Sequence, residues 1–293
     1  MKNILVVADL IDNPQMALDK AQQLASVTIA KIHITVFCYE SLATVKAEEA
    51  TEIKRILLSR TKQYWENYIR TNNVADSVTY EVIWEENIVP WLAKHCESTH
   101  YDLIVKSGNR SEATFHTPTD WQLFRESKVP IYCVNDRSKA AAKTDDSKTI
   151  VVALDLESDS KEKEALNLAL LEAGFQLSIQ TNSYLKGCCA INIPILLKDM
   201  NLIDVSEHID SMQAKILTKA ERLFDSYDLN IDNLVIQEGE PWKVITSTAS
   251  KEHADCIIVG SMGRTGVMGK LIGNTAEKTI HYASSDLLVI PPQ

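Results

Sequence analysis

The sequence predicts an α/β protein made of two tandem, doubly wound domains. Its 293 residues suit two domains of about 150 residues each. Apolar strand patterns alternate with helical patterns, which favours a parallel sheet with helices on both faces. The same order of patterns occurs twice, so we place the first domain at 1–136, a linker at 137–148 and the second domain at 149–293.

Each half opens with the strand that best identifies the repeat. The segments 4–9 and 150–155 are apolar, largely β-branched runs that end in an aspartate. Such runs are typical of strands buried on both faces of a parallel sheet. A helical pattern follows each strand, clearly at 17–25 and less cleanly at 165–172.

The remaining elements of the two halves correspond in order. The expected pairs are second strands at 32–37 and 176–180, long helices at 46–71 and 205–226, third strands at 78–84 and 233–237, fourth strands at 101–105 and 254–259 after a further helix, and last strands at 131–134 and 287–290. The segment between the halves is rich in Ala, Lys, Asp and Ser, as expected of a solvated linker.

Composition and charge narrow the class of function. The formal net charge is −10, and an acidic surface repels phosphate backbones, so we expect no nucleic-acid partner. No run approaches the roughly 20 apolar residues that span a bilayer, and the first residues do not read as a signal peptide. The six scattered cysteines suit free thiols in a reducing compartment, which indicates a cytoplasmic protein. Cys96 and His100 have helical spacing without a second ligand pair, so no metal site is predicted.

A glycine-rich segment follows the fourth strand of the second half. Five of the nine glycines in the chain lie there: Gly260, Gly263, Gly266, Gly269 and Gly273. Glycine lets the backbone approach a ligand closely, and ligands of doubly wound sheets bind beyond the carboxyl ends of the strands. The segment therefore predicts a ligand site, with a glycine-rich connection that binds nothing as the alternative.

A helix is expected from 273 to 281, directly after these glycines. Its free N–H groups and its dipole would form an anion site. The hydroxyl of Thr275 and the amide of Asn274 can cap this helix or donate to a phosphate. The segment is neither a Walker A loop nor a dinucleotide fingerprint, because Gly-Lys-Ser/Thr and Gly-x-Gly-x-x-Gly are absent.

The order Gly260-x-x-Gly263, nine residues, then Gly273-Asn274 is similar to the ATP-binding signature of the universal stress protein family. The flanking strands at 254–260 and 287–290 agree, and the whole chain resembles the tandem, E-type members of that family. The resemblance implies a five-stranded parallel sheet with about four helices in each domain, of the adenine nucleotide alpha-hydrolase-like kind. It also implies ATP as the ligand, with Mg²⁺ or Mn²⁺ on its phosphates.

The resemblance further implies which residues hold the nucleotide. In ATP-binding members an acid at the end of the first strand contacts adenosine, which by position is Asp155 beside Ala153 and Leu154. The segment that matches the phosphate and ribose contacts comprises Gly260, Ser261, Met262, Gly263, Gly273, Asn274 and Thr275. A helix N-cap or a salt bridge is the structural alternative for Asp155.

The first half departs from this pattern, so we expect ATP in the second domain only. After its fourth strand only Gly108 remains, and the connection is three residues shorter. Where the second half has 273–275, the first has Thr-Pro-Thr at 117–119, and E-type members carry a similar segment. Asp120 adds negative charge at the phosphate position, and Thr117 with Asp120 resembles a capping box. A lost nucleotide site is favoured over a remodelled one.

No arrangement typical of catalysis occurs in the sequence, so no catalytic residue is predicted. Cys188-Cys189 is better explained by packing than by redox chemistry. We expect a stress-response regulatory protein that binds ATP through its second domain, with at most slow hydrolysis. The alternatives are a slow ATPase or nucleotidyl transferase, and an interaction or lipid-binding module that needs no nucleotide.

Two further expectations concern surfaces. The apolar last strands at 131–134 and 287–290 would be exposed edges, so we expect them to pair and join the domains as an intramolecular pseudo-dimer, with a homodimer of chains also open. The run 184–200 is mostly apolar, and we expect it to roof a cavity for an apolar ligand, with plain packing onto the helix at 205–226 as the alternative.

Overall fold

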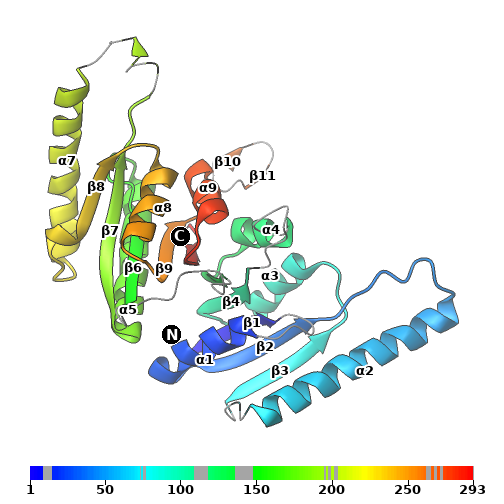
Figure 1. The fold of residues 1–293 in the computed structure, drawn as a ribbon. Helices are drawn as coiled ribbons and strands as arrows, with labels where there is room; N and C mark the ends of the chain where they lie inside the picture. The colour runs from blue at the N-terminus through cyan, green and yellow to red at the C-terminus, as the bar shows by residue number, and fades with distance from the viewer. Residues whose placement is uncertain are drawn as a thin grey trace. The chain divides into compact units, whose positions relative to one another are not determined.

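The computed structural model describes residues 1–8, 15–72, 74, 77–108, 118–135, 148–194, 196, 199–200, 204–261, 265–266, 269–270 and 273–292. The chain divides into two compact units, Met1–Asp136 and Arg137–Gln293 (Figure 1). The predicted linker lies outside the described residues, apart from Lys148 at its end.

The first unit contains one five-stranded parallel sheet with strand order β3-β2-β1-β4-β5. Its elements are β1 Asn3–Ala8, α1 Met16–Thr28, β2 Lys31–Phe37, α2 Ala47–Thr71, β3 Val78–Ile83, α3 Ile88–Ser98, β4 Leu103–Ser107, α4 Pro118–Glu126 and β5 Ile131–Val134. Helix α1 packs on β1 and β4, whereas α3 and α4 pack against each other. Because crossovers between parallel strands are right-handed, α1 lies on one face of the sheet and α3 and α4 lie on the other.

The second unit repeats this plan with strand order β12-β9-β6-β7-β8. Its elements are β6 Lys148–Ala153, α5 Lys161–Thr181, β7 Ser183–Ile191, α7 Val205–Asp225, a 3-10 turn Ile231–Asn233, β8 Leu234–Glu238, α8 Pro241–Lys251, β9 Cys256–Gly260, the hairpin strands β10 Thr265–Gly266 and β11 Gly269–Lys270, α9 Asn274–Tyr282 and β12 Asp286–Ile290. The predicted α/β class, with a five-stranded parallel sheet and four helices in each unit, is confirmed over the described residues.

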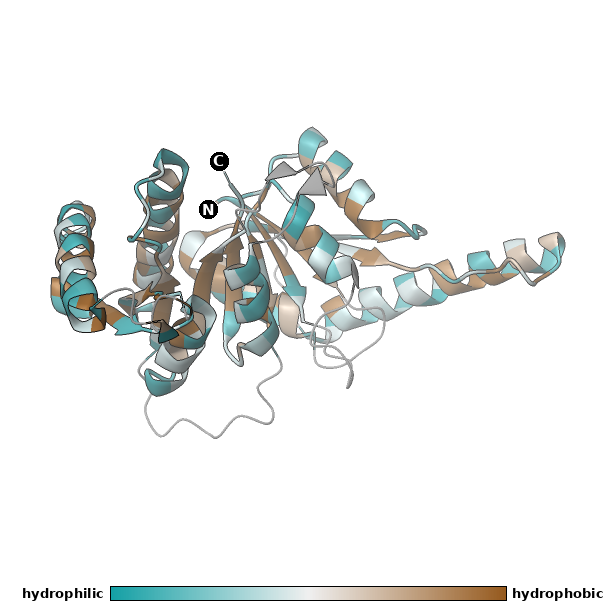
Figure 2. Ribbon diagram, turned by 90° about the horizontal axis from the view of Figure 1, so that it is seen from above, coloured by the Kyte–Doolittle hydropathy of each residue, from teal (hydrophilic) through white to brown (hydrophobic). Residues whose placement is uncertain are grey.

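The strands form where the sequence is continuously apolar, because both faces of each sheet are covered. Ile4, Leu5 and Val6 of β1 and Ile257 and Ile258 of β9 are completely buried. Burial of each such side chain contributes about 1.5–3 kcal/mol. Figure 2 shows the same pattern by colour, with brown strands and helices that are brown on one side and teal on the other.

The pairing of β1 with β4 in the first sheet has the same register as the pairing of β6 with β9 in the second. Ile4 of β1 lies beside Leu103 of β4, and Ile150 of β6 lies beside Cys256 of β9. Residues of β4 and β9 can therefore be compared position by position at the carboxyl ends of the two sheets.

The second strand of the second unit differs from the prediction. The segment 176–180 is the last part of α5, not a strand. Asn182 then takes a left-handed conformation (φ 49°), which is typical of a helix end, and β7 begins at the next residue. The physical reason is that the buried residues of α5 follow helical spacing: Leu170, Leu171, Gly174, Leu177 and Ser178.

This difference also overturns the expected roof at 184–200. Strand β7 lies between β6 and β8, and its residues 187–191 are all buried. The apolar character of residues 185–191 therefore follows from their place in a sheet covered on both faces, rather than from packing onto the helix at 205–226 alone. Leu196 and Met200, beyond the strand, are exposed. The apolar run therefore gives no reason to expect an apolar ligand at this segment.

Candidate functional site

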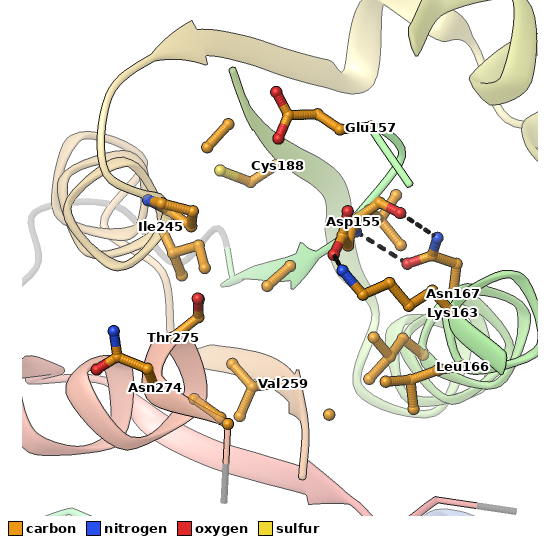
Figure 3. Close-up of a pocket in the computed structure, with 18 of the residues that line it drawn as sticks. Asp155, Glu157, Lys163, Leu166, Asn167, Cys188, Ile245, Val259, Asn274 and Thr275 are labelled. Carbon is orange, nitrogen blue, oxygen red and sulfur yellow. Dashed lines mark hydrogen bonds and ion pairs between the residues drawn. The ribbon is translucent and has the colours of Figure 1, made fainter. Parts of the chain in front are cut away.

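A cavity of about 730 Å³ opens at the carboxyl ends of β6 and β9 in the second unit (Figure 3). This volume is typical of sites that hold small molecules. The walls come from the end of β6, the first half of α5, β7, the end of β9, α8 and the first turn of α9. This edge is where ligands bind in doubly wound sheets.

Most of the residues predicted from the sequence meet at this cavity. Ser261 does not line it, because its N–H and hydroxyl both donate to the carbonyl oxygen of Ile290, at 2.9 and 3.3 Å. Met262 and Gly263 lie outside the described residues. The predicted residues that line the cavity are Ala153, Leu154, Asp155, Gly260, Gly273, Asn274 and Thr275.

Asp155 is held in place by Asn167 of α5. Asn167 Oδ1 accepts a hydrogen bond from the Asp155 N–H at 2.9 Å, and Asn167 Nδ2 donates to the Asp155 carbonyl at 2.8 Å. The Asp155 carboxylate accepts a hydrogen bond from Lys163 Nζ at 2.5 Å (Figure 3). The structural alternative for Asp155, a salt bridge, is thus present. Both side chains are close to half-exposed, so the pair is weak enough for a ligand to displace it.

The first turn of α9 faces the same cavity. Gly273 is its N-cap, and none of the described side chains caps this end of the helix. The first helical hydrogen bond runs from the Glu277 N–H to the Gly273 carbonyl at 2.9 Å. The N–H groups of Asn274, Thr275 and Ala276 therefore have no acceptor within the helix, and together with the dipole they can bind an anion.

The absence of a side chain at Gly260 lets α5 pack closely against the end of β9. A Cβ atom built at Gly260 would lie 2.5 Å from Leu166 Cδ2, which is too close. Because this position carries no side chain, α5 approaches the end of β9, and Leu166 becomes part of the cavity wall.

A further group of lining residues is apolar: Leu170, Cys188, Ala190, Ile245 and Val259. Burial raises the pKa of the Cys188 thiol to about 11 and that of its neighbour Cys189 to about 12. Both thiols are therefore protonated near neutral pH, where the reactive thiolate would be needed for redox chemistry. Packing, the favoured explanation for these cysteines, agrees with their burial.

Glu157 adds a second carboxylate to the cavity. It accepts a hydrogen bond from the Asn192 N–H at 3.1 Å. Burial raises the pKa of this carboxyl, and the neighbouring charge of Asp155 raises it further. The cavity is consequently polarised, with carboxylates on the β6 side and the positive end of a helix dipole at α9.

Several lining residues were not predicted from the sequence. Lys163, Leu166, Asn167 and Leu170 follow the spacing of one face of α5. That spacing indicates a helix face, but a single sequence does not separate a face that lines a cavity from one that only packs. Asn167, a buried polar residue on this face, is the signal that favours a site.

The first unit has a different arrangement at the matching positions. By register and helix start, Lys106 corresponds to Val259, and Asp120 corresponds to Ala276. Val259 and Ala276 line the cavity of the second unit, whereas Lys106 and Asp120 form a buried ion pair. Lys106 Nζ also donates to the Ser107 carbonyl at 2.7 Å. The negative charge of Asp120, which was expected to repel phosphates, is thus neutralised by the ion pair with Lys106. Thr117, the other residue of the expected capping box, lies outside the described residues.

Comparison with known proteins shows which protein family this chain resembles. The universal stress protein family matches residues 194–291, which include the glycine-rich segment. The Universal stress protein E homolog of Haemophilus influenzae is 28% identical over 309 residues, covering 99% of this chain and 97% of that protein. Universal stress protein E of Escherichia coli K12 is 29% identical over 305 residues, covering 99% of this chain and 94% of that protein.

Solved structures agree on the fold. A putative universal stress protein from Pseudomonas aeruginosa superposes with a TM-score of 0.72 at 23% identity, covering 100% of this chain and 94% of that one. A universal stress protein from Archaeoglobus fulgidus gives a TM-score of 0.63 at 16% identity, covering 99% and 98%. Among the described residues, no helix has the length and apolar character that crossing a bilayer requires.

Proposed function

Because the chain belongs to the universal stress protein family, we propose that it is a stress-response protein that binds ATP in the cavity of its second unit. One observation supports this most directly. The Asp155 carboxylate and the uncapped first turn of α9 line the same cavity. ATP carries the complementary groups, because its ribose hydroxyls can donate to a carboxylate and its phosphates suit a helix N-terminus.

The charges of the cavity suggest the orientation of the nucleotide. The carboxylates of Asp155 and Glu157 repel phosphates and favour hydroxyl donors. The start of α9 at 273–275 favours the phosphates. The apolar residues Val259 and Ile245 offer a surface for the adenine ring. We therefore expect the ribose beside β6 and the phosphates at α9.

The divalent cation expected with ATP would be held mainly by the nucleotide. Mg²⁺ in nucleotide sites keeps several waters and binds substrate phosphates rather than a protein cage. We assign no set of protein ligands to it. Its contribution when bound would be to reduce the negative charge that the phosphates bring to α9.

A substitution at the helix N-cap tests the proposal without disturbing the fold. Asp and Asn are both good N-cap residues, so Gly273→Asp and Gly273→Asn should each preserve or slightly stabilise α9. Only the aspartate adds a negative charge beside the phosphates. Titration with a fluorescent ATP analogue should show that Gly273→Asp abolishes binding, while Gly273→Asn keeps much of it.

Two further substitutions extend this test to the rest of the glycine-rich segment and to the first unit. Gly263→Val should abolish binding by steric block, and Asp9→Ala should leave it unchanged. Binding of the ATP analogue that survives Gly273→Asp in a folded protein would show that the nucleotide is held elsewhere. The same samples can be assayed for phosphate release, where we expect slow hydrolysis at most.

The physiological ligand can be identified directly. Mass spectrometry of small molecules released from protein purified without added nucleotide should detect an adenine nucleotide. Recovery of a lipid in its place would favour the alternative function, an apolar-ligand module.

A further inference from the structure

Three potential metal ligands meet in the first unit: His33, Glu81 and His95. His33 lies near the start of β2, Glu81 lies on the adjacent edge strand β3, and His95 lies near the end of α3. One ligand atom from each side chain lies within 4.8 Å of the other two. Far separation along the chain explains why sequence spacing does not predict this cluster.

The distances suit a small, four-coordinate cation. His33 Nε2 and Glu81 Oε1 are 3.0 Å apart, and His95 Nε2 and Glu81 Oε1 are 4.0 Å apart. With Zn–N and Zn–O bonds of about 2.0–2.1 Å, tetrahedral ligands lie about 3.3 Å from each other. The observed separations bracket this value, so small side-chain rotations would complete the set.

The ring orientations are already fixed by neighbouring groups. Thr79 Oγ1 lies 2.8 Å from His33 Nδ1 and can accept the proton of that nitrogen, which leaves Nε2 directed at Glu81. Trp91 stacks on His95 with ring centroids 4.5 Å apart and an interplanar angle of 15°. The hydrogen bond on the second nitrogen of His33 is typical of metal-binding histidines, whereas His95 is held by ring stacking.

We propose that His33, Glu81 and His95 form a zinc-binding site with a fourth position open to water. Two imidazoles and one carboxylate are a preferred donor set for Zn²⁺, and all three side chains are partly exposed, so the ion can enter. The Cys96 and His100 pair noted in the sequence is not this site. The largely exposed His100 has its Nε2 atom 3.2 Å from Asp102 Oδ1. Burial raises the pKa of the Cys96 thiol to about 11, which disfavours the thiolate that a metal would need.

Two hydrogen bonds compete with the metal, and the first joins His33 Nε2 to Glu81 Oε1 within the cluster itself. The Tyr101 hydroxyl lies 3.0 Å from His95 Nε2, the nitrogen that would bind zinc. Binding must displace this hydrogen bond. Its removal in Tyr101→Phe should therefore strengthen zinc binding, by about fivefold if the bond has an ordinary net strength. A purely structural role for these residues predicts no such gain.

The experiment uses the full chain, freed of any affinity tag and of metal, without nucleotide. Co²⁺ is added alone, and binding is followed by the visible absorption of four-coordinate cobalt. Zn²⁺ is then added and should displace the cobalt, which abolishes this absorption. One equivalent per chain should bind. His33→Gln, Glu81→Gln and His95→Gln should each weaken binding by more than the 10- to 100-fold typical of outer-shell losses, and Thr79→Val should weaken it by about 10-fold.

The matched control is His100→Gln, a histidine of the same unit outside the cluster, which should bind cobalt like the parent. Circular dichroism of each variant establishes that it is folded. Absence of the cobalt spectrum in the parent would overturn the proposal, as would equal binding by His33→Gln and His100→Gln.

Discussion

At the level of single residues, Ile29 occupies an unfavourable backbone conformation. It follows α1 at φ 56° and ψ 33°, and its side chain is 93% exposed. A β-branched residue is rarely left-handed, whereas glycine and asparagine commonly end helices in this way. Asn182 is the favoured counterpart at the end of α5.

We predict that Ile29→Gly stabilises the protein. Relief of left-handed strain is worth about 1–2 kcal/mol, and the added backbone freedom of glycine offsets part of it, which leaves a gain of about 1 kcal/mol. Urea unfolding followed by tryptophan fluorescence measures the change, because Trp65, Trp84, Trp91 and Trp121 lie in this unit. Val27→Gly, within α1 itself, should instead destabilise by about 0.3–0.5 kcal/mol, the difference in helix propensity between valine and glycine. A loss of stability in Ile29→Gly would contradict the prediction.

Asn167 carries a second prediction at this scale. Its side chain bonds both the N–H and the carbonyl of Asp155, so Asn167→Ala should lower the free energy of unfolding by roughly 2 kcal/mol, or about 1 per hydrogen bond. Lys163→Ala removes only a half-exposed ion pair and should cost less than about 1 kcal/mol. Urea unfolding followed by circular dichroism compares the two variants. Equal costs would mean that Asn167 does not hold Asp155.

Among the secondary-structure elements, the end of β4 and the start of α4 show how the first unit differs from the second. In the second unit Val259 and Ala276 leave one side of the cavity apolar. In the first unit the corresponding Lys106 and Asp120 are 7% and 1% exposed and pair with each other. A buried charge without its partner is costly, so these two residues depend on one another.

We predict a strong coupling between Lys106 and Asp120. Asp120→Ala alone should lower stability by about 3–5 kcal/mol, because it leaves a buried ammonium group unpaired. The double variant Lys106→Val with Asp120→Ala introduces the residues of the second unit and should be more stable than Asp120→Ala. A double-mutant cycle by urea unfolding measures the coupling. Additive costs would show that the pair does not act as a unit.

The order of elements follows from the sequence wherever a strand is continuously apolar. Within the runs predicted at 4–9 and 150–155, the strands β1 and β6 are largely buried on both faces, as a continuously apolar pattern indicates. The strand expected at 176–180 was wrong because Leu177 and Ser178 continue the buried face of α5. A short apolar run fits either structure, and only the position of β7 between β6 and β8 decides between them.

For the molecule as a whole, the candidate site was predictable only in part. The glycine-rich segment and the acid after β6 carry local patterns, so Asp155 and 273–275 could be placed at one edge of the sheet. The contributions of Lys163 and Asn167 depend on how α5 packs, which the sequence does not state. The three ligands of the proposed zinc site depend on strand pairing in the same way.

The last prediction concerns the number of nucleotides that one chain binds. The second unit has an open first turn at α9, whereas the first unit begins α4 with Pro118, which has no N–H, and has the Lys106–Asp120 pair nearby. Proline removes an anion donor, and the ion pair replaces apolar wall residues, so we expect one ATP per chain, in the second unit only. Equilibrium dialysis at saturating ATP with Mg²⁺ measures the number directly.

Variants in each unit distinguish this outcome from a second, weaker site. Gly273→Asp should reduce the bound ATP from one per chain to none. The double variant Lys106→Val with Asp120→Ala should still bind one, because removing the ion pair does not restore the N–H that Pro118 lacks. Two bound nucleotides in the parent, or one remaining in Gly273→Asp, would place a site in the first unit. The first unit would then be a second binding module, and the Lys106–Asp120 pair would need another explanation than the loss of a nucleotide site.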